Sequence, residues 1–180
     1  MELAPPVLAS NNRHTARYDT HTRGDEDETV AFLARQAGGR DALEFAVGTG
    51  RIALPLTRAG VRVDGIELSQ DMVDRMREKP GGNAIEVIIG DMSRVTAGHR
   101  YGLVYLVYNT IGNLLTQDEQ VICFQNAARH LDPGGVFVLE CRVPTAPSLP
   151  AGPPVRRRRG GRGGQRGTGR MPLRPGNPDP

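Results

Sequence analysis

The sequence predicts a doubly wound α/β fold built on one mainly parallel sheet. Short runs rich in Val and Ile alternate along the chain with segments of helical periodicity, and the first of these runs leads into a glycine-rich loop. This alternation is typical of right-handed crossovers between parallel strands. A chain of 180 residues is long enough for one domain of this class and too short for two ordinary ones.

The predicted elements follow one another in a regular order. A first helix is expected over residues 25–37, where acids come first, Val30 and Leu33 follow at helical spacing, and two glycines end the pattern. Strands are expected at residues 41–47, 61–68, 84–91, 101–109 and 135–141. The helical segments between them are residues 51–60, 69–82 and 116–135.

Two of these helices carry clear start signals. Ser69 is a predicted N-cap for a helix that buries Met72, Val73 and Met76. Thr116 and Glu119 form a T-x-x-E capping box. The helix that follows this box is expected to bury an apolar face made of Val121, Ile122, Phe124, Ala128 and Leu131.

The two ends of the chain fall outside the pattern. Residues 1–24 are polar and aperiodic, which predicts a flexible lead-in. Residues 143–180 hold nine Pro, eight Gly and eight Arg but only five sizeable apolar side chains. Such a segment buries too little surface to offset its ordering entropy, so we expect a disordered tail. The domain is therefore predicted to span residues 25–142.

The charge of the chain is unevenly distributed. The formal net charge is +3, but eight Arg against one Asp give residues 143–180 a charge of +7, which leaves −4 for residues 1–142. The basic pI therefore says nothing about the ligand of the domain. An RGG-like arm that binds nucleic acid is the functional alternative for the tail, but it has no Phe, Tyr or Trp to stack on bases, so nucleic acid is not an expected partner.

Composition also restricts the setting of the protein. Cys123 and Cys141 lie in no CxxC or Cys/His pattern, and the four His share no spacing, so neither a disulfide framework nor a metal site is expected. No window approaches the roughly 20 apolar residues of a membrane span, and the N-terminus lacks the pattern of an export signal. These features favour a cytoplasmic protein, and the oligomeric state is left open.

The glycine loop is the first functional signal. Residues 48–53, GTGRIA, satisfy the G-x-G-x-x-G/A fingerprint of dinucleotide binding, and Glu67 follows Gly50 at the end of the next strand. The motif alone is weak evidence, because Gly48 and Gly50 could serve only to make a tight turn.

Three acids narrow the choice of ligand. Glu44 precedes the loop, Glu67 ends the second strand and Asp91 ends the third, all toward the sheet edge where ligands bind in open α/β folds. A carboxylate at the mouth of the loop would repel a pyrophosphate. A ligand with an ammonium group, a ribose diol and an adenine amino group would instead meet acceptors for all three, and these are the donors of S-adenosylmethionine.

Four ordered motifs carry a family resemblance: LEFAVGTG at the first loop, GIELS after the second strand, GDM after the third, and LDPGG before the fifth. Together they resemble the class I S-adenosylmethionine-dependent methyltransferases, and most closely the small bacterial branch whose first loop reads E-F-A-V-G-T-G. The resemblance covers about residues 18–142 and implies a Rossmann-like methyltransferase sheet.

The resemblance also implies roles for individual residues. Glu44 would orient the loop and attract the methionine ammonium, while Gly48 and Gly50 would let the backbone approach the cofactor. Ala46 stands where the wider family often has its first Gly, and it narrows the room beside the loop. The remaining cofactor contacts would be Glu67 to the ribose hydroxyls, Leu68 against the adenine, Asp91 to the adenine amino group, Met92 to the ring, and Asn109 facing cofactor and acceptor.

Some of these positions have simpler explanations. Glu67 and Asp91 could be solvated residues at strand ends, Met92 could belong to the core, and Asn109 could be a turn or N-cap residue. A hydroxyl or ammonium acceptor would need a base, and the sequence does not identify one.

The family sheet continues past the fifth strand with a further helix and an antiparallel pair of strands, which this sequence lacks. The tail is rich in the residues that G/C-only codons specify, so we interpret it as a frameshift product and the domain as incomplete, with an uncovered fifth strand as its edge. The leading function is a methyltransferase for a small-molecule acceptor, with activity reduced by the truncation. The alternatives are a nicotinamide-dependent oxidoreductase and a non-catalytic remnant that only binds the cofactor.

Overall fold

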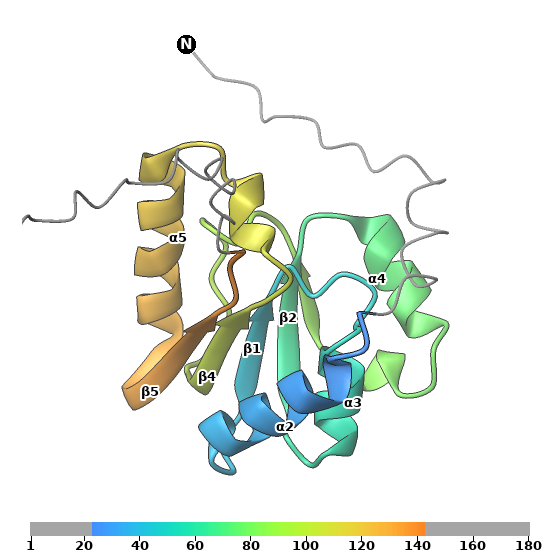
Figure 1. The fold of residues 1–180 in the computed structure, drawn as a ribbon. Helices are drawn as coiled ribbons and strands as arrows, with labels where there is room; N and C mark the ends of the chain where they lie inside the picture. The colour runs from blue at the N-terminus through green and yellow to red at the C-terminus, as the bar shows by residue number, and fades with distance from the viewer. Residues whose placement is uncertain (1–22, 143–180) are drawn as a thin grey trace, which may run out of the picture. The chain divides into compact units, whose positions relative to one another are not determined.

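The computed structural model describes residues 23–142, and the order of its strands is that of a doubly wound fold (Figure 1). Five strands form one sheet in the order β3-β2-β1-β4-β5, and every neighbouring pair is parallel. The predicted fold class is therefore confirmed. The lead-in lies outside the described residues up to residue 22, and the tail predicted over residues 143–180 lies outside them entirely.

The observed elements match the expected order. The strands are β1 Ala42–Phe45, β2 Val63–Glu67, β3 Val87–Ile89, β4 Tyr101–Leu106 and β5 Leu131–Leu139. The helices are α2 Glu26–Ala37, α3 Ala53–Arg58, α4 Gln70–Arg77 and α5 Gln117–His130, with short 3-10 turns at Gly82–Ala84 and Thr110–Asn113. The last strand begins at Leu131, earlier than predicted, because Leu131 already pairs with Tyr101 before the register shifts.

Helices cover both faces of the sheet. On one face α2, α3 and α4 bury a core with Leu33, Leu56 and Met76 at its centre. On the other face α5 and the connection from β3 to β4 bury a second core around Phe45, Ile66 and Val104. The three inner strands are fully buried along their length, as expected for parallel strands that are covered on both sides.

The predicted helix starts are confirmed. The Ser69 hydroxyl accepts a hydrogen bond from the Met72 amide at 3.4 Å. In the capping box, the Glu119 amide donates to Thr116 Oγ1 at 3.2 Å and the Thr116 amide donates to Glu119 Oε2 at 2.9 Å. These bonds satisfy amide groups that a helix start otherwise leaves unpaired.

The predicted inner face of α5 is wrong. Val121, Ile122 and Phe124 are 43%, 37% and 40% exposed, Ala128 is also exposed, and Leu131 is a half-buried strand residue. The buried side of the helix is Cys123, Asn126, Ala127 and His130. Polar residues face inward here because Asn126 Nδ2 donates to the carbonyls of Met92 and Val95, both at 2.8 Å, and so satisfies the irregular connection from β3 to β4.

His130 completes this link between α5 and the connection. Its Nε2 accepts from the Ala97 amide at 2.8 Å, and its Nδ1 lies 2.8 Å from the Asn126 carbonyl oxygen. Nδ1 must therefore carry the proton of a neutral imidazole. Burial lowers the pKa of His130, because a second proton would be held in an apolar site and would oppose the Ala97 N–H.

This geometry predicts an acid-sensitive fold. The folded chain binds fewer protons at His130 than the unfolded chain does. The stability that this residue contributes is therefore present above about pH 6.5 and is lost as the pH falls through the lowered pKa of His130 in the folded chain. Urea titrations between pH 8 and pH 5 should show the free energy of unfolding of the wild type falling relative to His130→Gln. Parallel pH profiles for the two proteins would contradict this assignment.

Candidate functional site

The loop after β1 turns sharply beside the carboxyl ends of the central strands. Gly48 and Gly50 have φ of 56° and 75°, and Ala46 has φ of 55°. A Cβ on Gly50 would lie 2.8 Å from Met76 Cγ and Sδ, so this glycine is required for packing as well as for backbone angle. Ala46 adopts a left-handed conformation that favours glycine, which agrees with its place at a glycine position of the resembled family.

Glu67 fastens this loop to the neighbouring strand. Its Oε2 accepts from the Gly48 amide at 2.8 Å, and its Oε1 accepts from the Ser69 amide at 3.0 Å. Glu67 is buried, with 8% exposure, although it is the last residue of its strand. One carboxylate therefore holds together the glycine loop, the end of β2 and the start of α4.

Glu44 lies underneath the loop and is buried. It is 3% exposed, its Oε2 accepts from the Tyr105 hydroxyl at 2.9 Å, and the Ala53 amide at the start of α3 also donates to it. Burial raises the pKa of Glu44 to about 8, while these two donors oppose the shift and the charge of nearby Glu67 adds to it. Tyr105 is buried as well, and burial raises the pKa of its hydroxyl group. A cation near the loop would favour the ionised form of Glu44.

Asp91 follows β3 and is more exposed to solvent than Glu44 or Glu67. Its Oδ1 accepts from both the amide and the hydroxyl of Ser93, at 2.8 and 2.7 Å, and Arg94 Nε lies 3.6 Å from Oδ2. Its side chain is 41% exposed. Leu68, directly after Glu67, is 54% exposed, which leaves an apolar surface beside the carboxylate.

Met92 and Asn109 are placed differently from the acids. Met92 is 7% exposed, lies in the α5-side core, and its carbonyl accepts from Asn126. Asn109 has φ of 57° at the N-cap position of a 3-10 turn, and its Oδ1 accepts from the Arg142 amide at 2.9 Å. The geometry agrees with Met92 as a core residue and with Asn109 as an N-cap residue of a turn. Contact of either residue with a ligand stays a prediction.

The strand order sets the candidate residues in a row. Asp91 follows β3, Glu67 ends β2, Glu44 with the loop belongs to β1, and Asn109 follows β4. Since the strands are parallel, all four lie toward the carboxyl edge of the sheet. The fold thus gathers Glu44, Glu67 and the glycines most closely and sets Asp91 and Asn109 to either side.

A second polar cluster lies at the same edge and was not predicted. The Arg23 guanidinium forms ion pairs with Asp25 and Glu140 and lies 4.7 Å from the centre of the Tyr108 ring. Arg51, next to the glycine loop, lies 5.2 Å from the same ring centre. The Tyr108 amide also donates to Glu140 Oε2 at 3.1 Å. No local pattern could have revealed this cluster, because its members come from four separate parts of the chain.

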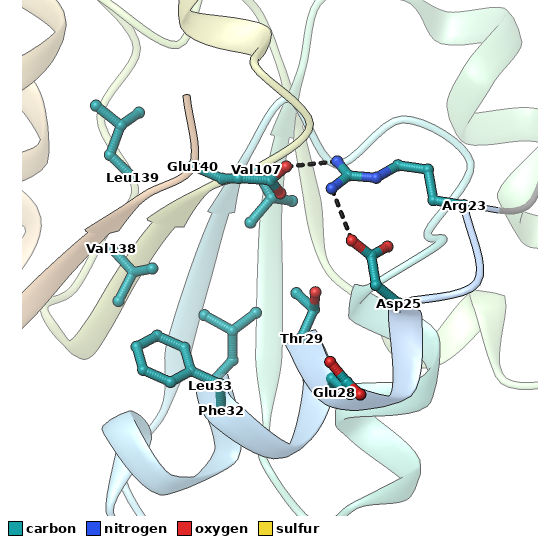
Figure 2. A pocket seen from close by; sticks show the side chains of 10 residues that line it. All are labelled: Arg23, Asp25, Glu28, Thr29, Phe32, Leu33, Val107, Val138, Leu139 and Glu140. Atoms are coloured by element: carbon teal, nitrogen blue, oxygen red, sulfur yellow. Dashed lines mark hydrogen bonds and ion pairs between the residues drawn. The ribbon is translucent and has the colours of Figure 1, made fainter. Parts of the chain in front are cut away.

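Beside this cluster is a cavity of about 400 Å³ between α2 and the ends of β4 and β5 (Figure 2). Figure 2 shows Arg23 reaching between Asp25 and Glu140 while Phe32, Leu33 and Val138 supply apolar surface. Glu28 adds a third carboxylate to the lining. The cavity therefore combines an apolar wall with a rim that carries more negative than positive charge.

Among residues 23–142, no group of three or more His, Cys, Asp or Glu is arranged to hold a metal ion. Within the same residues, no helix has the length and apolar character needed to cross a membrane.

Fold and site together define an α/β protein with a candidate ligand site at the carboxyl edge of a parallel sheet. The family model described as "Methyltransferase domain" matches residues 42–135, which is more than half of the chain. The chain belongs to this methyltransferase domain family. The family resemblance seen in the four sequence motifs is thereby confirmed.

Individual relatives agree with this assignment. The chain is 31% identical over 117 residues to a cypemycin N-terminal methyltransferase of Streptomyces sp, a match that covers 64% of this chain and 48% of the relative. The CcbJ methyltransferase from Streptomyces caelestis has a similar structure, with a TM-score of 0.66 and 38% identity over 70% of this chain and 54% of that one. A glycopeptide N-methyltransferase, MtfA, solved in complex with S-adenosyl-L-methionine, gives a TM-score of 0.57 and 29% identity over 68% and 52% of the two chains. The chain spans about half the length of these relatives.

The raised pKa of Glu44 predicts a second pH dependence of stability. The unfolded carboxyl titrates near 4.5 and the folded one near 8, so its contribution is complete below pH 4.5 and is lost as the pH rises through 8. Glu44→Gln keeps an acceptor for Tyr105 without the ionisation. The unfolding free energy of the wild type should fall relative to this variant by up to about 1.4 kcal/mol per pH unit within that window. A constant difference between the two proteins from pH 5 to pH 9 would contradict the assignment.

Proposed function

We propose that this chain binds S-adenosylmethionine along the row of acids and supports methyl transfer to an amine nitrogen of a small-molecule acceptor. The observation that carries the proposal is the pairing of a buried acid beneath the glycine loop with a second acid that holds the loop. The Glu67 carboxylate lies where a dinucleotide would need a site for its phosphates, and the buried Glu44 beneath it, with a pKa raised to about 8, is ionised more readily beside a cation than beside a phosphate.

The geometry suits the three polar parts of the cofactor. Each oxygen of Glu67 accepts one backbone bond, and a carboxylate has about four acceptor sites, so capacity remains for two ribose hydroxyls. Leu68 gives an apolar surface for the adenine, and Asp91 Oδ2 lies in an open setting for its amino group. Ionised Glu44 would favour the cationic methionine end.

The nicotinamide-dependent alternative fits less well. It would place a pyrophosphate beside the Glu67 carboxylate, which would repel it, and close to the buried Glu44, whose ionisation a phosphate would oppose further. The relatives described above are named methyltransferases, and one of them was solved with S-adenosyl-L-methionine. A remnant that binds the cofactor without catalysis remains the competing interpretation.

The relatives and the cavity both support an amine as the acceptor. Two of the three relatives are named for methylation at nitrogen. The cavity beside the ends of β4 and β5 has an apolar wall and a rim with three carboxylates, Asp25, Glu28 and Glu140, and one guanidinium. This lining favours an amine attached to an apolar body.

Bound S-adenosylmethionine would supply an electrophilic methyl group. The chain would contribute positioning, by holding the acceptor nitrogen in line and about 3–3.5 Å from the methyl carbon. A carboxylate of the cavity rim could take the proton that the amine releases. The half-exposed position of these acids gives that proton a path to water.

The binding step predicts a specific loss in one variant. Calorimetric titration with S-adenosylhomocysteine should show binding by the wild type, and Glu67→Gln should weaken it at least about tenfold, because one ribose acceptor is lost and the loop loses its anchor. Asp74→Asn, an exposed acid on α4, is the matched control and should bind as the wild type does. Tight binding of NAD with none of S-adenosylhomocysteine would overturn the proposal.

The transfer step is tested with cofactor that carries a labelled methyl group. Incubation with a panel of amino sugars and peptides that have free N-termini should place label on nitrogen. Cofactor binding without label transfer to any amine would identify a binding remnant instead of an enzyme.

A further inference from the structure

The segment that follows β3 forms a compact turn around Asp91. The carbonyl oxygen of Asp91 accepts from the amides of Arg94 and Val95, both at 2.9 Å. Its side-chain Oδ1 accepts from the amide and the hydroxyl of Ser93. Val95 packs back on the end of β3, so closely that a Cβ on Gly90 would lie 2.2 Å from Val95 Cγ2. Oδ1 is thus engaged within the turn, and Oδ2 is the oxygen of Asp91 that lies open toward a ligand.

Asn126 on α5 holds this turn from the inside of the protein. Its side chain is fully buried, and its Nδ2 donates to the carbonyl oxygens of Met92 and Val95, both at 2.8 Å. A side-chain amide carries two N–H donors on one nitrogen, and both are used here. The two carbonyls belong to the first and the fourth residue after Asp91. One side chain of α5 therefore fixes the turn at two points along its length.

The oxygen of the same side chain shows that this arrangement has a cost. Asn126 Oδ1 is buried and has no hydrogen-bond partner among residues 23–142. A buried polar atom without a partner destabilises the folded chain. An apolar side chain at this position would avoid that cost, but it would leave the carbonyls of Met92 and Val95 without their donor. The amide of Asn126 therefore contributes to the turn and not to the apolar packing of α5.

We propose that Asn126 is a positioning residue for recognition of the adenine amino group, acting through the turn that carries Asp91. The inference rests on the proposed function, in which Asp91 Oδ2 accepts a hydrogen bond from that amino group. Since hydrogen bonds weaken steeply with poor geometry, Oδ2 must be held at a defined place to accept it. A purine with an oxygen in place of the amino group would face Oδ2 with a second acceptor. The fixed turn therefore selects adenine over such a purine.

His130 offers a matched comparison on the same helix. It lies one turn after Asn126, is also buried, and also bonds the connection from β3 to β4. Its Nε2, however, accepts from the Ala97 amide, beyond the turn that carries Asp91, and its ring packs edge-on against Phe45 with ring centres 5.9 Å apart. Replacing His130 is therefore expected to lower the stability of the fold without displacing Asp91.

The inference is tested on the full chain by calorimetric titration with two ligands, S-adenosylhomocysteine and S-inosylhomocysteine, in which an oxygen replaces the adenine amino group. The wild type should bind the first roughly tenfold more tightly than the second, because a hydrogen bond to a carboxylate is lost. In Asn126→Ala this ratio should fall to about threefold or less, whereas His130→Gln should keep the wild-type ratio. A merely structural role of Asn126 would weaken both ligands alike and leave the ratio unchanged.

A measurement on the wild type covers the case in which Asn126→Ala does not fold. In nuclear magnetic resonance spectra, S-adenosylhomocysteine should shift the side-chain amide resonances of Asn126 together with the Ser93 amide. An unchanged ligand ratio in Asn126→Ala, or Asn126 resonances that stay in place while that of Ser93 moves, would overturn the inference. Equal wild-type affinity for the two ligands would overturn it as well. A wild type that binds neither ligand would instead refute the proposed function itself.

Discussion

The clamp formed by the Glu67 carboxylate is the interaction on which the candidate site depends. By accepting from the Gly48 and Ser69 amides, Glu67 joins the glycine loop to the end of β2 and to the first turn of α4. Without it, two part-buried amides would lose their acceptor, which costs up to about 1–3 kcal/mol for each one that water does not reach. One carboxylate thus links three segments of the chain at the carboxyl edge of the sheet.

The electrostatics of the site follow from the placement of Glu44 below this clamp. Two acids close to each other, one of them buried, cannot both be ionised at low cost, and this is why burial and Glu67 together raise the pKa of Glu44. A ligand with positive charge relieves that cost, whereas a phosphate increases it. In the proposed function, Glu44 within β1 is the residue that suits this glycine loop to a cationic cofactor.

The parts of the fold that were predictable are those with local causes. Parallel strands, the glycine loop and the capping box at Thr116 each leave a pattern in neighbouring residues. The buried side of α5 did not, because Asn126 and His130 face inward to satisfy a distant connection rather than to bury apolar area. The cluster of Arg23, Arg51, Tyr108 and Glu140 was likewise out of reach, since only the fold brings these residues together.

The central claim is that residues 23–142 already contain an assembled cofactor edge. The most direct test is to record amide spectra by nuclear magnetic resonance on the labelled chain while S-adenosylmethionine is added. The amides of Gly48 and Ser69 donate to Glu67, and the amide of Ser93 donates to Asp91. The account predicts that the resonances of these three amides shift together with a single affinity, and that NAD does not shift them. Shifts confined to other parts of the chain, or shifts of these three amides with NAD alone, would contradict it.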